Sequence, residues 1–249
     1  MSFSGGKGKL ILSCFPGIDL LGRAFAEEMP EVCIVRGPDL IFGGDHKRFH
    51  VPAGVFWGLI AGDPCQAHGK LKHMIIATHG LKALAEDMTH EVERIINEAQ
   101  PEWFIRENSP FAYDLIAEGY IIKRVSLDNR WLGERQQRKR CFWFGTRNGR
   151  KLSIEVAALE AFDREQAVTS SGQRVSIRMG GNGKIKSTWQ EGQRRRRSED
   201  SLELQGFPRD LLADAPFTEQ GKREVIANGV PRAMGRAIAR AVRRAMEAQ

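Results

Sequence analysis

Runs of apolar side chains alternate with helical patterns from residue 10 to about residue 147. The apolar runs predict strands at residues 10–12, 32–35, 55–61, 103–105, 120–127 and 141–144. Between these runs, residues 20–29 form a short helical pattern. Apolar side chains also recur at helical spacing over residues 81–100, up to Pro101. Strands that alternate with helices favour an α/β domain with a mainly parallel sheet.

The pattern changes after Gly149. Residues 164–200 are rich in Arg, Gly, Ser and Gln and contain only brief apolar stretches. A segment this polar cannot build much core of its own, which predicts an inserted lobe or long loops. Near the C-terminus an amphipathic helix begins at Pro231, where a missing N–H is tolerated. We therefore expect three segments: residues 1–148, a small lobe at 149–203, and residues 204–249 returning to the main domain.

Charge and hydropathy narrow the function classes. The net charge of +7 and the pI near 9.4 favour a polyanionic partner. No apolar run approaches the roughly 20 residues that span a bilayer, and the first residues lack the apolar segment of a signal peptide. These features predict an intracellular protein that does not use a membrane. The polar segment also contains a basic run, formed by Arg194, Arg195, Arg196 and Arg197.

The four cysteines have no CxxC spacing, so we expect neither a disulfide framework nor a zinc site. Cys14, Cys33 and Cys141 lie on or beside predicted strands and are interpreted as small buried hydrophobes. Cys65 differs because it follows Pro64 directly at the end of the apolar run 55–61. That strand-end position predicts a functional thiol.

An acid and two arginines follow Cys65 in the chain, each beside a predicted strand. Glu107 follows the apolar run 103–105, where a low dielectric would raise its pKa towards the protonated form. Arg138 and Arg140 precede the run 141–144. An unperturbed thiol is only a few per cent thiolate at neutral pH, so the two arginines are the candidates to stabilise it. The set could attack a nitrogen heterocycle.

A cofactor pocket is expected at the turn after the first strand, because α/β folds bind nucleotides at the carboxyl ends of strands. Phe15, Gly17 and Ile18 lie in that turn, and Gly17 would allow close backbone approach. Asp39 and Asp45 follow the second strand and could reach ribose hydroxyls or an adenine amino group.

These residues, in this order, resemble the motifs of the DNA (cytosine-5) methyltransferase family. The resemblance runs from about residue 10 to 242, except for the lobe at 149–200. Its motif segments are Phe15-Pro16-Gly17, Gly44-Asp45, Pro64-Cys65-Gln66, Glu107-Asn108, the set Gln136, Arg138 and Arg140, Leu204-Gln205-Gly206-Phe207-Pro208, and Ala227-Asn228-Gly229-Val230-Pro231.

The resemblance implies a Rossmann-like, S-adenosylmethionine-dependent enzyme that flips a cytosine out of double-stranded DNA and methylates carbon-5 through a cysteine adduct. Cys65, Glu107, Arg138 and Arg140 would be the catalytic set. Pro64 and Asn228 would join the cofactor site, and the lobe would recognise the target. Gln66 and the basic run at 194–197 would contact DNA. The implied enzyme is a cytoplasmic monomer without metal, in a bacterium or a phage-infected cell, of the type found in restriction–modification.

The chain departs from the family pattern at several positions. Asp19 and Leu20 replace glycines of the first motif, Asp63 replaces the first of two prolines, and His68-Gly69 replaces a Phe-Ser pair. Two alternatives therefore remain open: a cytosine-5 methyltransferase of RNA, and a non-catalytic DNA-binding relative.

Overall fold

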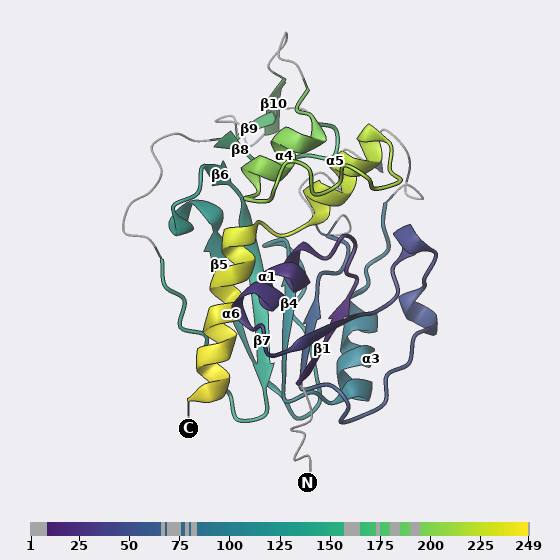
Figure 1. Ribbon diagram of the computed structural model, residues 1–249, viewed down its shortest axis with the longest axis vertical. Helices are drawn as coiled ribbons and strands as arrows, with labels where there is room; N and C mark the ends of the chain where they lie inside the picture. The colour runs from purple at the N-terminus through teal and green to yellow at the C-terminus, as the bar shows by residue number, and fades with distance from the viewer. Residues whose placement is uncertain are drawn as a thin grey trace, which may run out of the picture.

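The computed structural model describes residues 9–65, 68, 76–77, 80, 84–156, 165–172, 175–179, 185–189 and 195–248. Its centre is a six-stranded sheet with the order β2-β1-β3-β4-β7-β5 (Figure 1). The strands are β1 (Leu10–Cys14), β2 (Cys33–Arg36), β3 (Gly58–Ala61), β4 (Trp103–Asn108), β5 (Ile121–Asp128) and β7 (Lys139–Thr146).

Strand direction brings chemically important segments to one edge of the sheet. Strands β1, β2, β3 and β4 are parallel neighbours, whereas β7 is antiparallel to both β4 and β5. The pairing of Asn108 with Cys141 places the start of β7 beside the end of β4. The carboxyl ends of β1, β3 and β4 therefore meet the amino end of β7, which carries Arg140.

Helices cover both faces of this sheet and form a smaller group beyond its upper edge (Figure 1). The helices are α1 (Leu20–Glu28), α3 (Thr89–Ala99), α4 (Ser198–Leu204), α5 (Glu219–Asn228) and α6 (Arg232–Glu247). On one face, Phe25 of α1 and Met234 of α6 share an apolar core with Trp103. On the other face, Ile96 of α3 packs with Phe104. Successive side chains of β4 thus enter opposite cores, as strand geometry requires.

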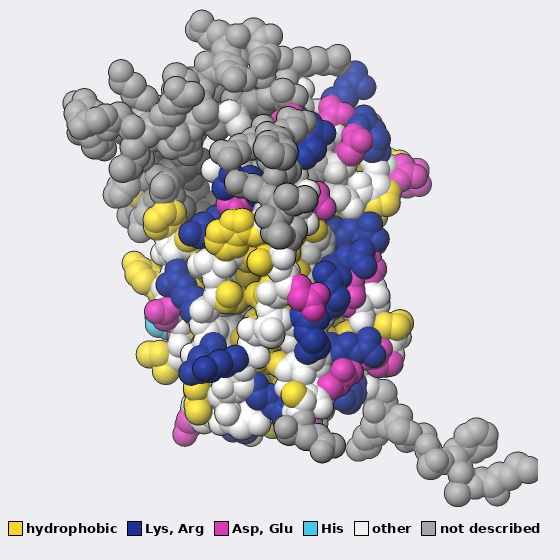
Figure 2. Space-filling view, turned by 90° about the vertical axis from the view of Figure 1, so that its left-hand side faces the viewer, with side chains coloured by type: hydrophobic (Ala, Val, Ile, Leu, Met, Phe, Trp, Pro, Cys, Tyr) yellow, Lys and Arg dark blue, Asp and Glu magenta, His cyan; other side chains and the backbone are white. Residues whose placement is uncertain are grey.

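The arginines of α6 are largely engaged with acidic side chains of α1. Arg232 contacts Glu27 at 2.9 Å, and Arg236 and Arg240 both bind Glu28. Figure 2 accordingly shows blue and magenta side chains intermingled along the right-hand side of the face that it presents. These arginines fasten the last helix to the main domain.

A third apolar cluster lies beyond the sheet edge and joins distant parts of the chain. It brings Val168 and Leu202 together with Phe207 and Ile226, and it reaches Leu20 at the start of α1. Strands β9 (Val175–Met179) and β10 (Ile185–Trp189) form an antiparallel pair in the same upper region (Figure 1). Short parallel pairing also connects β6 (Gln136–Gln137) with β8 (Glu165–Gln166). The cluster crosses the predicted boundary between residues 203 and 204.

Two details differ from the sequence prediction. The helix expected over 81–100 begins at Thr89: residues 84–88 are not helical, and residues 81–83 lie outside the described part. At this start the Asp87 carboxylate accepts from the Thr89 backbone N–H at 3.0 Å and from its hydroxyl at 2.6 Å. Cys33, expected to be buried, is exposed because β2 is an edge strand, whereas Cys14 and Cys141 are buried as predicted.

Among the described residues, no helix combines the length and the apolar character needed to cross a bilayer.

Candidate active site

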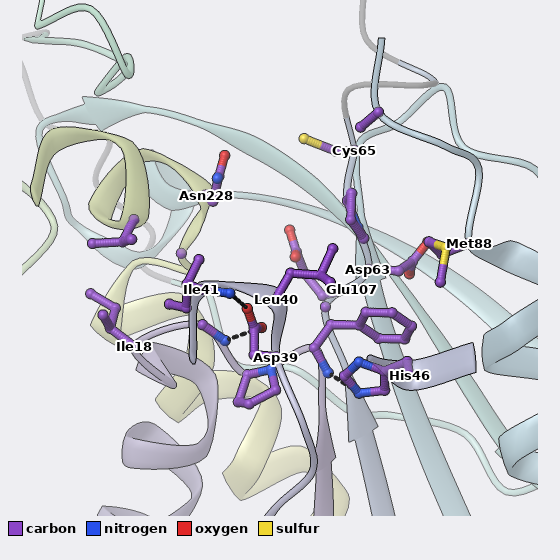
Figure 3. A pocket seen from close by; sticks show the side chains of 18 of the residues that line it. Ile18, Asp39, Leu40, Ile41, His46, Asp63, Cys65, Met88, Glu107 and Asn228 are labelled. Atoms are coloured by element: carbon purple, nitrogen blue, oxygen red, sulfur yellow. Dashed lines mark hydrogen bonds between the residues drawn. The ribbon is translucent and has the colours of Figure 1, made fainter. Parts of the chain in front are cut away.

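A cavity of about 490 Å³ opens at the carboxyl ends of β1, β3 and β4 (Figure 3). It unites residues that are far apart in the sequence, including every residue predicted to hold a cofactor. The predicted residues that line it are Phe15, Gly17, Ile18, Asp39, Asp45, Pro64, Cys65, Glu107, Arg140 and Asn228. The same edge of the sheet therefore holds both the expected cofactor pocket and the expected nucleophile.

The turn after β1 is held by a histidine that sequence analysis did not identify. The rings of Phe15 and His46 stack with centroids 3.7 Å apart, and the Phe15 backbone N–H donates to His46 Nε2 at 2.9 Å. Burial lowers the pKa of His46 to about 4, against weaker opposing effects of nearby carboxylates. His46 is therefore neutral at physiological pH, as an accepting ring nitrogen must be. In the sequence, only its position directly after Asp45, a predicted cofactor residue, could have indicated that His46 lies at this site.

Gly17 and Asp39 form a second contact across this turn. Gly17 has a φ of 52°, which favours glycine, and a Cβ built there would meet no atom within 4 Å. Its N–H donates to Asp39 Oδ2 at 2.8 Å, while Asp39 Oδ1 accepts from the Ile41 N–H at 3.0 Å. Both carboxylate oxygens are thus oriented by backbone donors, and the side chain lines the cavity (Figure 3).

Cys65 and Glu107 approach the cavity from adjacent strands. Cys65 is partly exposed in the loop after β3, and its side chain points into the open space (Figure 3). Glu107, at the end of β4, is buried, and that burial raises its pKa, although Arg140 acts in the opposite direction. Arg140 Nε lies 2.8 Å from Glu107 Oε1 in a close ion pair. Burial therefore favours the protonated form of Glu107, whereas the adjacent guanidinium favours the carboxylate.

Arg138 has a different position from that of Arg140. It is buried and does not line the cavity. Its Nη2 donates to the backbone carbonyls of Ala227 at 2.5 Å and Gly229 at 2.8 Å, which fixes the C-terminal end of α5, where Asn228 lies. Burial, and then Arg140, lower the pKa of Arg138 to about 9, so it stays charged at neutral pH. Cys65 is among the groups that oppose this shift, which places the thiol within electrostatic reach of Arg138.

The basic run divides between exposed and buried side chains. Arg195 and Arg197 are exposed. Arg196 is buried, where its Nη2 binds Glu165 Oε2 at 2.6 Å and its Nη1 donates to the Gln166 carbonyl at 3.0 Å. The expectation that Arg196 contacts phosphate is therefore corrected: its guanidinium joins α4 to the β8 segment. Two other residues expected to contact DNA, Gln66 and Arg194, lie outside the described residues.

Asp63, a departure from the family pattern, is completely buried beside the cavity. Its two carboxylate oxygens each accept from Arg106 at 2.7 Å, and Asn108 Nδ2 donates to Oδ2 at 3.0 Å. Neither Asp63 nor Arg106 exposes its side chain. Asn108 therefore ties the end of β4 to the segment that precedes Cys65. Sequence analysis missed Arg106, although the alternation of β4 places it on the face opposite Glu107.

Within the part of the chain that the structure describes, no group of three or more His, Cys, Asp or Glu side chains is placed to hold a metal ion. The donor set of the cavity is instead suited to an organic ligand, because apolar Leu40, Ile41 and Met88 line it beside a few oriented polar groups.

Comparison with known proteins gives a family match and several likenesses of fold. A family model described as C-5 cytosine-specific DNA methylase matches residues 44–175, more than half of the chain. Comparison with curated proteins gives no match.

Among solved structures, the Entamoeba histolytica methyltransferase EhMeth has a TM-score of 0.68 at 11% identity, covering 98% of this chain and 100% of its own. A DNA modification methyltransferase encoded within an E. coli prophage has a TM-score of 0.55 at 14% identity, with 96% and 100% covered. DNMT2 of Spodoptera frugiperda has a TM-score of 0.58 at 10% identity, again with 96% and 100% covered.

Proposed function

Because this chain belongs to the family of C-5 cytosine-specific DNA methylases, we propose that it methylates carbon-5 of cytosine in double-stranded DNA, with S-adenosylmethionine as donor. The predicted fold, a Rossmann-like methyltransferase with a mixed, mainly parallel sheet, is confirmed. The observation that carries the proposal is one cavity lined by Cys65, Glu107 and Arg140 together with the expected cofactor residues.

The residues of the cavity fit the proposed donor. A volume of about 490 Å³ is within the range of cofactor sites. The open space at Gly17 allows close approach to the backbone, and Asp39 offers a carboxylate to hydroxyl groups. Leu40 and Ile41 supply apolar contact for an aromatic ring. When bound, S-adenosylmethionine supplies an electrophilic methyl group.

The protein must then activate cytosine, whose carbon-5 is a poor nucleophile. In the proposed mechanism the Cys65 thiolate adds to carbon-6 of the flipped base, and Glu107 shares its proton with ring nitrogen-3. The electron pair moves to carbon-5, which would take the methyl group as the carbon–sulfur bond of the donor breaks and the donor leaves as a neutral thioether. Loss of the carbon-5 proton to a base and departure of the thiolate restore the ring. The raised pKa of Glu107 suits the proton donor. Arg138 interacts electrostatically with Cys65, and Arg140 lines the same cavity in an ion pair with Glu107.

Trapping on DNA tests this proposal directly. A 5-fluorocytosine in a duplex has no proton at carbon-5 for the last step, so the adduct with Cys65 should accumulate in the presence of S-adenosylmethionine. Cys65→Ser should form no adduct but should keep donor binding. Cys33→Ser is the matched control, because Cys33 is exposed on β2 away from the cavity. Equal turnover by Cys65→Ser and the parent protein would refute the assignment of Cys65 as the nucleophile.

The substrate class is tested in the same format. The family description names DNA, and the exposed Arg195 and Arg197 of the lobe region suit phosphate contact. Bisulfite sequencing of DNA from cells that express the protein would reveal methylated positions and the target sequence together. If the protein methylates structured RNA and not duplex DNA, its substrate is RNA, and the proposal of a DNA substrate is wrong. Donor binding without transfer to either would favour the non-catalytic relative.

A further inference from the structure

A chain of buried polar contacts begins two residues before Cys65. The Asp63–Arg106 pair is bidentate at 2.7 Å, and both side chains are fully buried. Arg106 is otherwise satisfied by the Tyr113 carbonyl at 2.7 Å and by the Thr89 hydroxyl at 2.8 Å. Because a buried guanidinium with all its partners in place has one orientation, the position of Asp63 is fixed relative to β4.

The same contacts return to the chain three residues after Cys65. The Thr89 hydroxyl, which accepts from Arg106, donates to Asp87 Oδ1 at 2.6 Å. That oxygen also lies 3.1 Å from Nε2 of His68, whose side chain is buried. The backbone N–H of His68 donates to the Cys65 carbonyl at 3.0 Å. The turn that carries the thiol is therefore held at both ends by one network, with the Thr89 hydroxyl at its centre.

This network also reaches the strand of the acid. Glu107 stands between Arg106 and Asn108 on β4, and both neighbours bind Asp63. The alternation of the strand directs Glu107 to the cavity and Arg106 away from it. Any displacement of the Cys65 turn from Glu107 must then break charge-assisted hydrogen bonds. A misplacement of about 1 Å between reacting groups can slow a reaction by roughly 100-fold.

Stability alone does not account for such an arrangement. A buried ion pair is on average no more stabilising than a well-packed apolar pair of similar volume. What the polar contacts add is direction, since hydrogen bonds fix angles that apolar packing leaves loose. Here the directed contacts converge on the two segments that supply the thiol and the acid.

We propose that Asp63, Arg106, Thr89, Asp87 and His68 form a positioning network that sets Cys65 against Glu107. The inference rests on the proposed function, because it explains how the thiol and acid of that site are aligned. None of the five is a catalytic residue; they act through Cys65.

The hydroxyl of Thr89 can be removed with little change of shape, which gives a matched pair of variants. Thr89→Val keeps the volume and deletes the central hydrogen bonds, whereas Thr89→Ser keeps the hydroxyl. We expect adduct formation on 5-fluorocytosine duplexes to slow by at least about 10-fold in Thr89→Val and by less than about twofold in Thr89→Ser. The KM for S-adenosylmethionine should stay unchanged in both, while kcat falls in the valine variant alone.

Glu28→Gln controls for loss of stability, because Glu28 binds Arg236 and Arg240 on the far α1–α6 surface. It should lower the melting temperature and leave the adduct rate unchanged. The network is overturned if Thr89→Val and Thr89→Ser react equally fast, or if Glu28→Gln, at equal loss of melting temperature, slows the reaction as much as Thr89→Val.

Alkylation separates this inference from the proposed function. The Cys65 peptide, quantified by mass spectrometry after iodoacetamide treatment, should be modified several-fold faster in Thr89→Val than in Thr89→Ser or the parent. This readout needs neither DNA nor donor. If the parent protein forms no adduct, the proposed function fails, and alkylation still decides whether the network holds the turn. Equal rates of Cys65 alkylation in Thr89→Val and Thr89→Ser would refute the positioning network.

Discussion

Protonation of His46 should destabilise this protein in mild acid. His46 is buried, stacks on Phe15 and accepts the Phe15 backbone N–H through Nε2. A proton on Nε2 would remove that acceptor and would place a charge in a site that burial disfavours. Arg94 also disfavours the charge, whereas Asp39, Asp45 and Glu91 oppose the shift in part.

The size of the effect follows from the two pKa values. The pKa of His46 falls from 6.5 to about 4 on folding, so between these values the unfolded chain binds more protons than the folded protein. The stabilising contribution is therefore complete above the unfolded pKa and is lost as the pH falls. Linkage gives a loss of about 2 kcal/mol between about pH 7.5 and pH 5, approaching about 3 kcal/mol below the folded pKa.

Urea unfolding at a series of pH values measures this contribution. His46→Gln removes the titration while its amide oxygen can still accept from Phe15. Its free energy of unfolding should therefore fall by about 2 kcal/mol less than that of the parent between pH 7.5 and pH 5. His90→Gln is the matched control, because it makes the same substitution at an exposed side chain. Parallel profiles for the parent and His46→Gln would refute the reasoning.

Four further predictions concern the cavity and the basic run at 194–197. Glu107→Gln should lower methyl transfer by roughly 100-fold or more without a change in donor affinity measured by calorimetry, because an amide cannot give up the proton. Arg138→Met should weaken donor binding and lower the unfolding free energy by about 3 kcal/mol, because the C-terminal end of α5 loses two charge-assisted hydrogen bonds. Arg195→Ala with Arg197→Ala should weaken binding to duplex DNA and reduce the salt slope by about 2. By contrast, Arg196→Ala should lower the melting temperature, because Arg196 belongs to a buried ion pair.

Sequence reasoning succeeded where local pattern and strand polarity were sufficient. The apolar runs around β1, β3 and β4 show where each strand ends, and parallel strands necessarily gather those ends at one edge. For this reason Gly17, Cys65 and Glu107 could be expected at one site, although they are far apart in the chain. The exact limits of the strands differ by one to a few residues, because hydrogen bonding to neighbouring strands decides where each begins.

Sequence reasoning failed where the partner of a polar residue is set by tertiary contacts. Nothing in the basic run distinguishes Arg196 from its exposed neighbours, since Glu165 approaches it from a separate segment. The ring of His46 likewise gains its role from a turn 31 residues away. Cys33 shows the converse case, because an apolar run does not reveal that its strand lies at the edge of the sheet.

Two of the departures from the family pattern, Asp19 and Asp63, are buried acids, and each forms an ion pair with an arginine. Asp19 stands at a backbone φ of 59°, a left-handed conformation that aspartate tolerates better than most residues. Its carboxylate caps α1 through the Gly22 N–H at 3.1 Å and binds Arg36, at the end of β2, at 2.9 Å. Asp63 has the corresponding partner in Arg106. In each case a buried acid introduced into one motif is neutralised by an arginine on a neighbouring strand. An unpaired buried carboxylate at either position would destabilise the segments that form the cavity, so each arginine supports the structure of the site.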